Sequence, residues 1–358
     1  MPCFVKATDM KKIVLTSPRH FAIEETRMPE PAAGQAVVRI QKVGICGSDV
    51  HLYRSGHIGE TKLHGPFVIG HECVGRVEAV GPGVGKDIVG RRVAVEPAMS
   101  CGHCPWCLVG KTNICPTVRF LGTPPTPGAM QECLLHPADL LEPLPDSVTD
   151  KAAVVLEPLA IGLHAVNLVK VRPGQRVAVL GTGVIGTCVL AVLGLYRGLH
   201  VVCVDILEDR LERAAAMGAA AVVNAARLSD AEAATETKTA LGGYGADVVF
   251  ECAGVEQTNW SMCEVAAPDG HVAVVGITQD DQVSFNHSRA RRKGLTLRLV
   301  RRSLHTLRPC IELAAAGVLR PEQLVTHVFA AAQVDKAYRL VDAADKGVLK
   351  ALVDMESW

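Results

Sequence analysis

The segment 176–205 constrains the fold most, because it joins a β-like run, a glycine-rich turn and an acidic residue at a fixed spacing. The β-like run 177–180 leads into the turn 181–186 (Gly-Thr-Gly-Val-Ile-Gly), and an apolar helical stretch continues to residue 195. Glycines at this spacing allow a tight turn, a close approach of the backbone to a pyrophosphate, and packing of the helix on its strand. We therefore predict a strand–turn–helix unit that binds a dinucleotide.

Asp205 ends the next β-like run, 19 residues after Gly186. A carboxylate at this point bonds both hydroxyls of an adenosine ribose and repels a 2′-phosphate, which favours NAD over NADP. Arg210 follows five residues later and is expected to pack beside the adenine. The alternative is a glycine turn that binds no phosphate.

Strand and helix patterns continue to alternate up to about Leu299, which is typical of a doubly wound parallel sheet. The further β-like runs are 219–224, 246–251 and 271–277. Between Lys12 and Glu96 the pattern differs, because short β-like runs are broken by Pro and Gly, as in a compact, mainly β domain. The tail from Leu304 is too short for a domain of its own and is expected to return to the first one. We predict a catalytic domain of residues 1–160 and 300–358 around a dinucleotide-binding domain of residues 161–299.

Composition supports two soluble domains and a small-molecule partner. The 358 residues exceed the usual size of one hydrophobic core, and 49% are apolar. The 37 Lys and Arg balance the 37 Asp and Glu, which excludes a global basic field for nucleic acid or an anionic membrane. Residues 1–12 lack a signal pattern, and no apolar run reaches the roughly 20 residues of a membrane span. We expect a cytoplasmic protein with its 13 cysteines reduced or bound to metal.

Metal-ligating side chains are concentrated in residues 44–72. Cys46 lies near the start of this segment, and the pair His71-Glu72 ends it. Thiolate, imidazole and carboxylate are the ligands of a zinc site that keeps one position open for substrate. Glu157 is a further candidate ligand, because a carboxylate in an apolar helical run is costly unless it is paired or bound to metal. The alternative for Glu157 is a helix-end glutamate that faces solvent.

Four cysteines lie at the spacing of a closed metal site. Two residues separate Cys101 from Cys104 and Cys104 from Cys107, and Cys115 follows after seven more. Four thiolates occupy all four coordination positions of a tetrahedral zinc ion and leave none for a substrate oxygen, so we predict a structural site. His103 is expected to be a solvent-facing loop residue. Four unrelated buried thiols are the alternative.

Taken together, these motifs resemble the zinc-containing medium-chain dehydrogenases, and more narrowly their polyol dehydrogenase branch. The resemblance covers nearly the whole chain. The elements that carry it are Gly44-Ile-Cys-Gly-Ser-Asp-Val-His51, Gly70-His-Glu72, Val95-Glu-Pro97, the cysteine group, Gly122-Thr-Pro-Pro125, Val155-Leu-Glu-Pro-Leu159, the glycine turn and Val325-Thr-His327. It implies a GroES-like, mainly β catalytic domain, a Rossmann domain, and assembly into a homodimer or homotetramer.

The resemblance also implies roles for individual residues. Ser48 and His51 match the positions that relay the proton. The catalytic zinc positions are Cys46, His71, Glu72 and Glu157, and the resemblance leaves open which glutamate touches the metal. With the four cysteines this gives two zinc ions per chain. The cofactor positions are Gly181, Gly183, Val184, Ile185, Gly186, Asp205, Arg210, Val275, Gly276, Ile277, Leu299 and Arg301.

The expected activity is the transfer of a hydride between NAD and a polyol or secondary alcohol such as sorbitol or xylitol, with Glu157 and Arg301 as polar contacts. Leu52 and Arg302 depart from the tyrosines of mammalian sorbitol dehydrogenase, so the polyol-facing wall is expected to differ. A threonine-like amino alcohol, a cyclitol, or an acidic or phosphorylated sugar therefore stays open as substrate. A non-catalytic NAD-binding protein is a further alternative, although such proteins typically lack the zinc ligands.

Overall fold

The computed structural model describes residues 9–278 and 282–358, and the chain divides into two compact units. Unit 1 contains residues 1–157 and 311–358, and unit 2 contains residues 158–310. These divisions fall within the helices α3 (Asp150–Val169) and α9 (Leu307–Ala315). The domain boundaries predicted at residues 160 and 300 lie near them and stay a prediction. Residues 1–8, where no signal pattern is expected, lie outside the described part.

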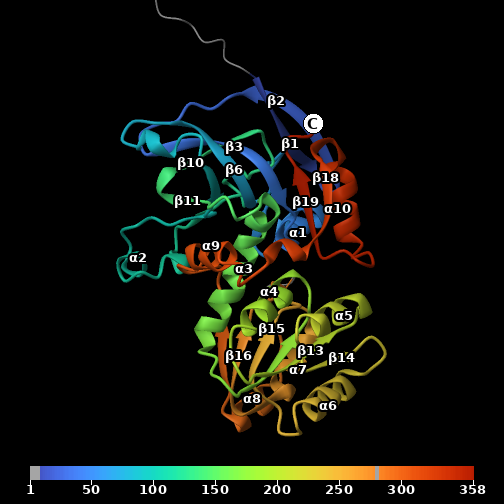
Figure 1. The fold of residues 1–358 in the computed structure, drawn as a ribbon. Helices are drawn as coiled ribbons and strands as arrows, with labels where there is room; N and C mark the ends of the chain where they lie inside the picture. The colour runs from blue at the N-terminus through green and yellow to red at the C-terminus, as the bar shows by residue number, and fades with distance from the viewer. Residues whose placement is uncertain (1–8, 279–281) are drawn as a thin grey trace, which may run out of the picture. The chain divides into compact units, whose positions relative to one another are not determined.

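Unit 1 is built on a sheet whose central strand is β3 (Gln35–Gly44). β6 (Glu72–Val80) pairs along one edge of β3 in antiparallel register. The other edge is shared, because β10 (Cys133–Pro137) pairs with its first half and β19 (Lys350–Asp354) with its last residues. Figure 1 shows β19, drawn in red, beside β3, drawn in blue. The C-terminal tail thus belongs to the same sheet as the first strands of the chain.

The remaining strands of unit 1 extend this sheet or form short hairpins. The sheet order is β11-β7-β6-β3-β19-β18, with β7 (Arg92–Val95), β11 (Leu141–Pro143) and β18 (Val325–Ala330). The hairpins are β1 (Asp9–Ser17) with β2 (His20–Arg27), β4 (His57–Ile58) with β5 (Thr61–Lys62), and β8 (Ala98–Met99) with β9 (Arg119–Phe120). The helices α1 (Gly47–Ser55), α2 (Pro105–Leu108) and α10 (Val334–Asp342) complete the unit. Its core includes Val38, Ile40, Leu52, Tyr53 and Tyr338.

Unit 2 is a six-stranded parallel sheet with the order β14-β13-β12-β15-β16-β17. The strands are β12 (Arg176–Leu180), β13 (His200–Asp205), β14 (Ala221–Asn224), β15 (Ala246–Glu251), β16 (Ala266–Val274) and β17 (Thr296–Leu299). The helices between them are α4 (Val184–Leu193), α5 (Glu208–Ala216), α6 (Asp230–Ala240), α7 (Glu256–Val265) and α8 (His287–Lys293) (Figure 1). This is the predicted doubly wound order, in which the direction of winding reverses between β12 and β15.

The sequence patterns predicted the positions of these helices and strands more accurately than the residues at which they end. The helix expected to reach residue 195 ends at Leu193, with Gly194 as its C-cap residue. α3 is long and apolar enough to span a membrane by composition, but 83% of its apolar window is buried inside the protein. That burial is typical of the core helix of a globular protein.

Candidate active site

The end of β3 and the start of α1 place the first group of predicted site residues. Cys46 occupies the N-cap of α1 in an extended conformation. Asp49, in the first turn, accepts a hydrogen bond from the amide of Cys46 at 3.2 Å, which satisfies a donor that the helix leaves free. Ser48 and His51 are three residues apart in the same helix and therefore lie on one face of it.

β6 brings the second pair of predicted ligands to the same place. Glu72, its first residue, lies opposite Gly44, the last residue of β3. His71 and Glu72 are 4% and 1% exposed. The ligand atoms of Cys46, His71 and Glu72 all lie within 4.8 Å of one another, as a shared metal ion requires. The antiparallel register of β3 and β6 therefore assembles ligands that are 25 residues apart in sequence.

This group stabilises positive charge. Burial by itself would lower the pKa of His71, but the negative charges of Asp49 and Cys46 raise that pKa well above its usual value. Nδ1 of His71 lies 3.3 Å from Oδ1 of Asp49. The contact orients the imidazole as second partners of metal-bound histidines do. Ligand types, burial and charge thus all fit zinc.

Glu157 lies in α3 and is buried, with 6% of its surface exposed. The alternative of a solvent-facing glutamate is therefore wrong. Among the described residues its Oε2 atom has no hydrogen-bond partner. Burial raises the pKa of Glu157 to about 8, with Glu72 and Glu96 also raising it while His71 and Lys350 lower it. The carboxyl group lies outside the group of three ligand atoms but within their electrostatic reach.

Two residues at this site were missed as partners in the sequence, Asp49 and Lys350. Lys350 is 1% exposed, forms an ion pair with Oε2 of Glu72, and donates a hydrogen bond to the carbonyl of Ile45 at 3.0 Å. A lysine at the start of the apolar run 350–353 was the available signal. Leu52, expected to alter the polyol-facing wall, is instead buried in the hydrophobic core of unit 1.

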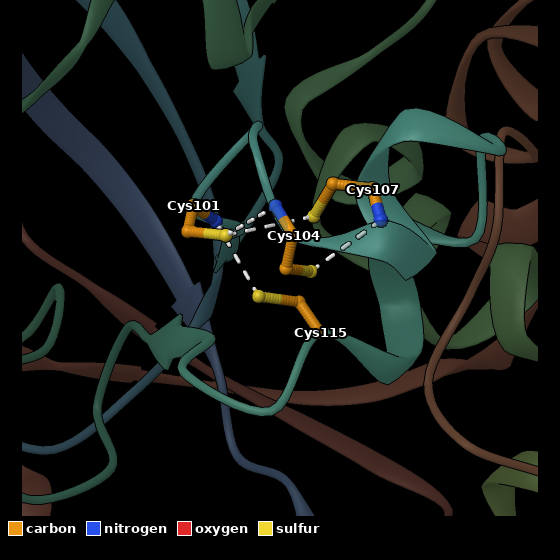
Figure 2. A group of neighbouring side chains, drawn as sticks. All are labelled: Cys101, Cys104, Cys107 and Cys115. Atoms are coloured by element: carbon orange, nitrogen blue, oxygen red, sulfur yellow. Dashed lines mark hydrogen bonds between the residues drawn. The ribbon is translucent and has the colours of Figure 1, made fainter.

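The four cysteines predicted to bind a structural zinc ion (Cys101, Cys104, Cys107 and Cys115) lie close together in unit 1, as Figure 2 shows. Their Sγ atoms lie within 4.8 Å of one another, and backbone amides of the loop point at them: Cys101 N to Cys115 Sγ at 3.5 Å, Cys104 N to Cys101 Sγ at 3.4 Å, and Cys107 N to Cys104 Sγ at 3.5 Å. The amides of His103 and Cys104 lower the pKa of Cys101 to about 6, which favours the thiolate. His103 is exposed and stands outside the group. The twelve cysteines of the described residues are all free of disulfides.

The glycine turn of unit 2 follows β12, and its geometry requires glycine. Gly181 has a φ of 89°, and a Cβ on Gly186 would collide with the carbonyl oxygen of Gly181. Gly183 is the N-cap of α4, and Val184 and Ile185 form the first turn. The first-turn amides of a helix have no partner within it and can bind a phosphate.

Asp205 ends β13 and locks this turn. Its Oδ2 atom accepts from the amide and hydroxyl of Thr182 at 2.7 and 3.0 Å, and Oδ1 accepts from the amides of Ile206 and Leu207 at 2.8 and 3.1 Å. Nη1 of Arg210 lies 3.9 Å from Oδ2 of the same carboxylate. Thr182 was missed in the sequence, because only the glycines of the turn carry the recognisable pattern.

The other predicted cofactor residues follow the ends of β16 and β17. The amides of Val275 and Gly276 donate to the carbonyl of Glu251, at the end of β15. Ile277 and Leu299 are exposed, and Arg301 comes two residues after β17. All these positions lie at the carboxyl edge of the parallel sheet, where open α/β sheets bind their ligands. Glu251 was also missed: its Oε1 atom accepts from the amides of Ala253 and Gly254 and from Thr258, and so fixes the neighbouring loop.

Comparison with known proteins agrees with this architecture. Residues 32–146 match the alcohol dehydrogenase GroES-like domain, and residues 184–316 match the zinc-binding dehydrogenase domain. The sorbitol dehydrogenase of Bacillus subtilis (strain 168) is 32% identical over 96% of this chain and 97% of its own length. An Escherichia coli oxidoreductase of unknown specificity, ECK1772, superposes with a TM-score of 0.90 at 33% identity, covering 97% of this chain and 99% of that one.

A second solved structure, the alcohol dehydrogenase rspB of E. coli CFT073, was determined with NADH. It superposes with a TM-score of 0.87 at 31% identity over 97% of this chain and 100% of its own. The matches span both units in order, so the likeness is not confined to one motif. The chain therefore belongs to the zinc-binding medium-chain alcohol dehydrogenases, in the branch that includes the sorbitol dehydrogenases.

Proposed function

We propose that this protein oxidises a neutral polyol or a related secondary alcohol with NAD, and that it reduces the matching ketose in reverse. The observation that carries the proposal is the group of Cys46, His71 and Glu72, with the buried Glu157 nearby, whose Oε2 atom has no hydrogen-bond partner among the described residues. Three protein ligands leave a position for substrate, as in zinc sites that catalyse reactions. Glu157 can either bind the metal as a fourth protein ligand or form a polar contact with the polyol.

Bound zinc would supply a Lewis acid that acidifies the substrate hydroxyl, and NAD would supply the hydride acceptor. The chain itself has to hold the ligands and remove a proton. Ser48 can accept the hydroxyl proton while donating its own, and His51 lies one helical turn further on. Burial, Arg54 and His57 lower the pKa of His51, so the imidazole stays neutral near pH 7 and can accept the proton.

On the cofactor side, the glycine turn would hold the pyrophosphate. Asp205 braces the turn and places negative charge where a 2′-phosphate would lie, which supports NAD as the working cofactor. The remaining cofactor positions, from Val275 to Ile277 with Leu299 and Arg301, would flank the nicotinamide half. We also propose a homodimer or homotetramer in the cytoplasm, which light scattering and fractionation would test.

An oxidation panel tests the activity directly. Purified protein with a measured zinc content is offered sorbitol, xylitol, galactitol, myo-inositol, threonine and a sugar phosphate, each with NAD and with NADP. We expect NAD-dependent oxidation of at least one neutral polyol and two zinc ions per chain. Preference for threonine or the sugar phosphate would replace the polyol assignment. Fewer than two zinc ions together with no oxidation would favour a non-catalytic NAD-binding protein.

A further inference from the structure

Lys350 stands out among the described residues because a buried lysine is costly unless its charge is paired. It is the first residue of β19 and is 1% exposed. Its ammonium group has two partners, Oε2 of Glu72 and the backbone carbonyl of Ile45. Neither partner is incidental, since Glu72 belongs to the metal-ligating group and Ile45 directly precedes Cys46.

The backbone of β19 also binds Ile45, through the amide of that residue. The amide of Ile45 donates to the carbonyl of Ala351 at 3.0 Å, while the carbonyl of Ile45 accepts from Lys350 at 3.0 Å. Both polar groups of the residue before Cys46 are therefore bound by neighbouring residues of one strand. Gly44 completes the arrangement, because a Cβ at that position would collide with Oε2 of Glu72.

A neighbouring strand in turn fixes the start of β19. The hydroxyl of Thr326, in β18, donates to the carbonyl of Lys350 at 3.1 Å and accepts from the amide of Leu349 at 3.0 Å. Nδ1 of His327 lies 3.0 Å from the same hydroxyl. The Val-Thr-His element at residues 325–327 thus has a structural role, because Thr326 fixes the backbone at Lys350.

We propose that Lys350 is a positioning residue for the catalytic metal, which fixes Cys46 and Glu72 relative to each other and balances the charge of Glu72 when the metal is absent. The inference rests on the proposed zinc site. The ammonium group of Lys350 binds the backbone beside Cys46 and the carboxylate of Glu72, so the distance between these two ligands, one before α1 and one in β6, depends on it. Glu72 then has two positive partners, lysine and zinc, and the lysine supports the zinc-free form.

Replacement of Lys350 by Met removes the charge and keeps a long apolar side chain. In Lys350→Met the buried carboxylate of Glu72 has zinc as its remaining cationic partner, so the zinc-free protein should lose more stability than the zinc-loaded protein. The increase in Tm on adding zinc should therefore exceed the wild-type increase by roughly 5 °C or more. Cobalt in place of zinc should give visible absorption bands that differ from those of the wild type, because Glu72 is no longer held.

Three further variants separate this role from ordinary stabilisation. Lys42→Met is the matched control, since Lys42 in β3 forms a 3.0 Å ion pair with Asp354 at the other end of β19, away from the ligands. Lys42→Met should keep the wild-type zinc-induced Tm increase and cobalt spectrum. Lys350→Arg keeps the charge and should restore most of both. The double variant Glu72→Gln/Lys350→Met removes both charges and should recover much of the lost Tm of the zinc-free protein.

The measurement uses full-length protein dialysed against a chelator until one zinc ion per chain remains, then reloaded with zinc or cobalt. If Lys350→Met and Lys42→Met change the zinc-induced Tm increase and the cobalt spectrum equally little, the inference is wrong while the zinc site stands. If the wild type takes up no second metal ion, the zinc site and this inference fall together. If Lys350→Met does not fold, recovery of folding in the double variant supports the pairing with Glu72, and failure of both variants overturns it.

Discussion

Oδ1 of Asp49 lies 3.3 Å from Nδ1 of His71, and Oδ2 of the same carboxylate accepts the backbone amide of Cys46 at 3.2 Å. A single side chain thus contacts two predicted zinc ligands, one through its ring and one through its backbone. The contact through Nδ1 constrains the orientation of the His71 ring, which is the role of a second partner of a metal-bound histidine. A residue of this kind affects the metal without touching it.

Asp49→Asn is therefore expected to weaken zinc binding at the catalytic site by about 10- to 100-fold. The amide oxygen can still accept from the amide of Cys46, so the helix cap is kept while the charge beside His71 is lost. Competition with a chromogenic chelator measures the affinity. Asp87→Asn, an exposed acid of the same unit, is the control. An Asp49→Asn affinity equal to that of the wild type would show that His71 needs no charged partner.

Ser48→Ala should lower the turnover of alcohol oxidation by about 100-fold or more, because it removes the hydroxyl that passes the proton on. Zinc content should remain two ions per chain. Ser55→Ala serves as control: its hydroxyl lies in the last turn of α1 and binds the backbone carbonyl of His51 at 2.9 Å. Steady-state kinetics with metal analysis gives both readings. Wild-type turnover in Ser48→Ala would remove this residue from the proton path.

Asp205→Asn should reduce the preference for NAD over NADP by about tenfold or more, since the charge that repels a 2′-phosphate is lost. The KM for NAD should rise as well. An amide offers one acceptor where the carboxylate accepts four donors from Thr182, Ile206 and Leu207, so the glycine turn loosens. Values of kcat/KM measured with both cofactors decide the matter, and an unchanged ratio would mean that other residues select the cofactor.

His136 should make the protein acid-sensitive. Burial lowers its pKa to about 4, while its Nε2–H donates to the carbonyl of Glu96 at 3.0 Å. The unfolded chain, with a histidine pKa near 6.5, binds the proton first, so stability present above pH 6.5 is lost as pH falls towards 4, by about 3 kcal/mol in all. His136→Gln keeps a donor but does not titrate, and its Tm should depend less on pH across that window. His20→Gln, an exposed histidine of the same unit, should follow the wild-type curve; parallel curves for all three proteins would contradict the argument.

Gly44→Ala should destabilise unit 1 by about 1–3 kcal/mol, because the added methyl group meets both the carboxylate of Glu72 and the side chain of Val154. Zinc content should fall with it. Gly47→Ala is a close control, since a Cβ at Gly47 meets nothing within 4 Å and alanine suits the first turn of α1. Urea unfolding of the two variants compares them, and equal free energies of unfolding would mean that Glu72 can shift at little cost.

The sequence predicted what depends on local pattern or on the chemistry of single side chains. The turn 181–186 and Asp205 carry their meaning within one strand–helix–strand unit, so the fold class and the dinucleotide edge were predicted. Cys46, His71 and the four cysteines Cys101, Cys104, Cys107 and Cys115 were predicted as zinc ligands because few other roles suit such residues at that spacing, and the structure brings their ligand atoms together in two groups. The family and the fold class are confirmed by the matches along the whole chain.

What the sequence did not reveal is which residues become partners through the topology. Lys350 meets Glu72 only because β19 pairs with the end of β3, and no local pattern announces that pairing. Asp49 stands inside a recognised motif, yet its contact with His71 depends on the register of β3 and β6. Leu52 was expected in the polyol-facing wall, whereas its side chain lies in the hydrophobic core of unit 1.

The position of Lys350 in the chain has a consequence for folding during synthesis. A ribosome makes Cys46, His71 and Glu72 early, but it must then make all of unit 2, residues 158–310, before Lys350 exists. Unit 2 is continuous in sequence and can fold while the chain is still growing, whereas the sheet of unit 1 lacks β19 until all of unit 2 has been made. Until then Glu72 lacks its internal counter-ion, Lys350, so a bound metal ion is the cation that can offset its charge during synthesis.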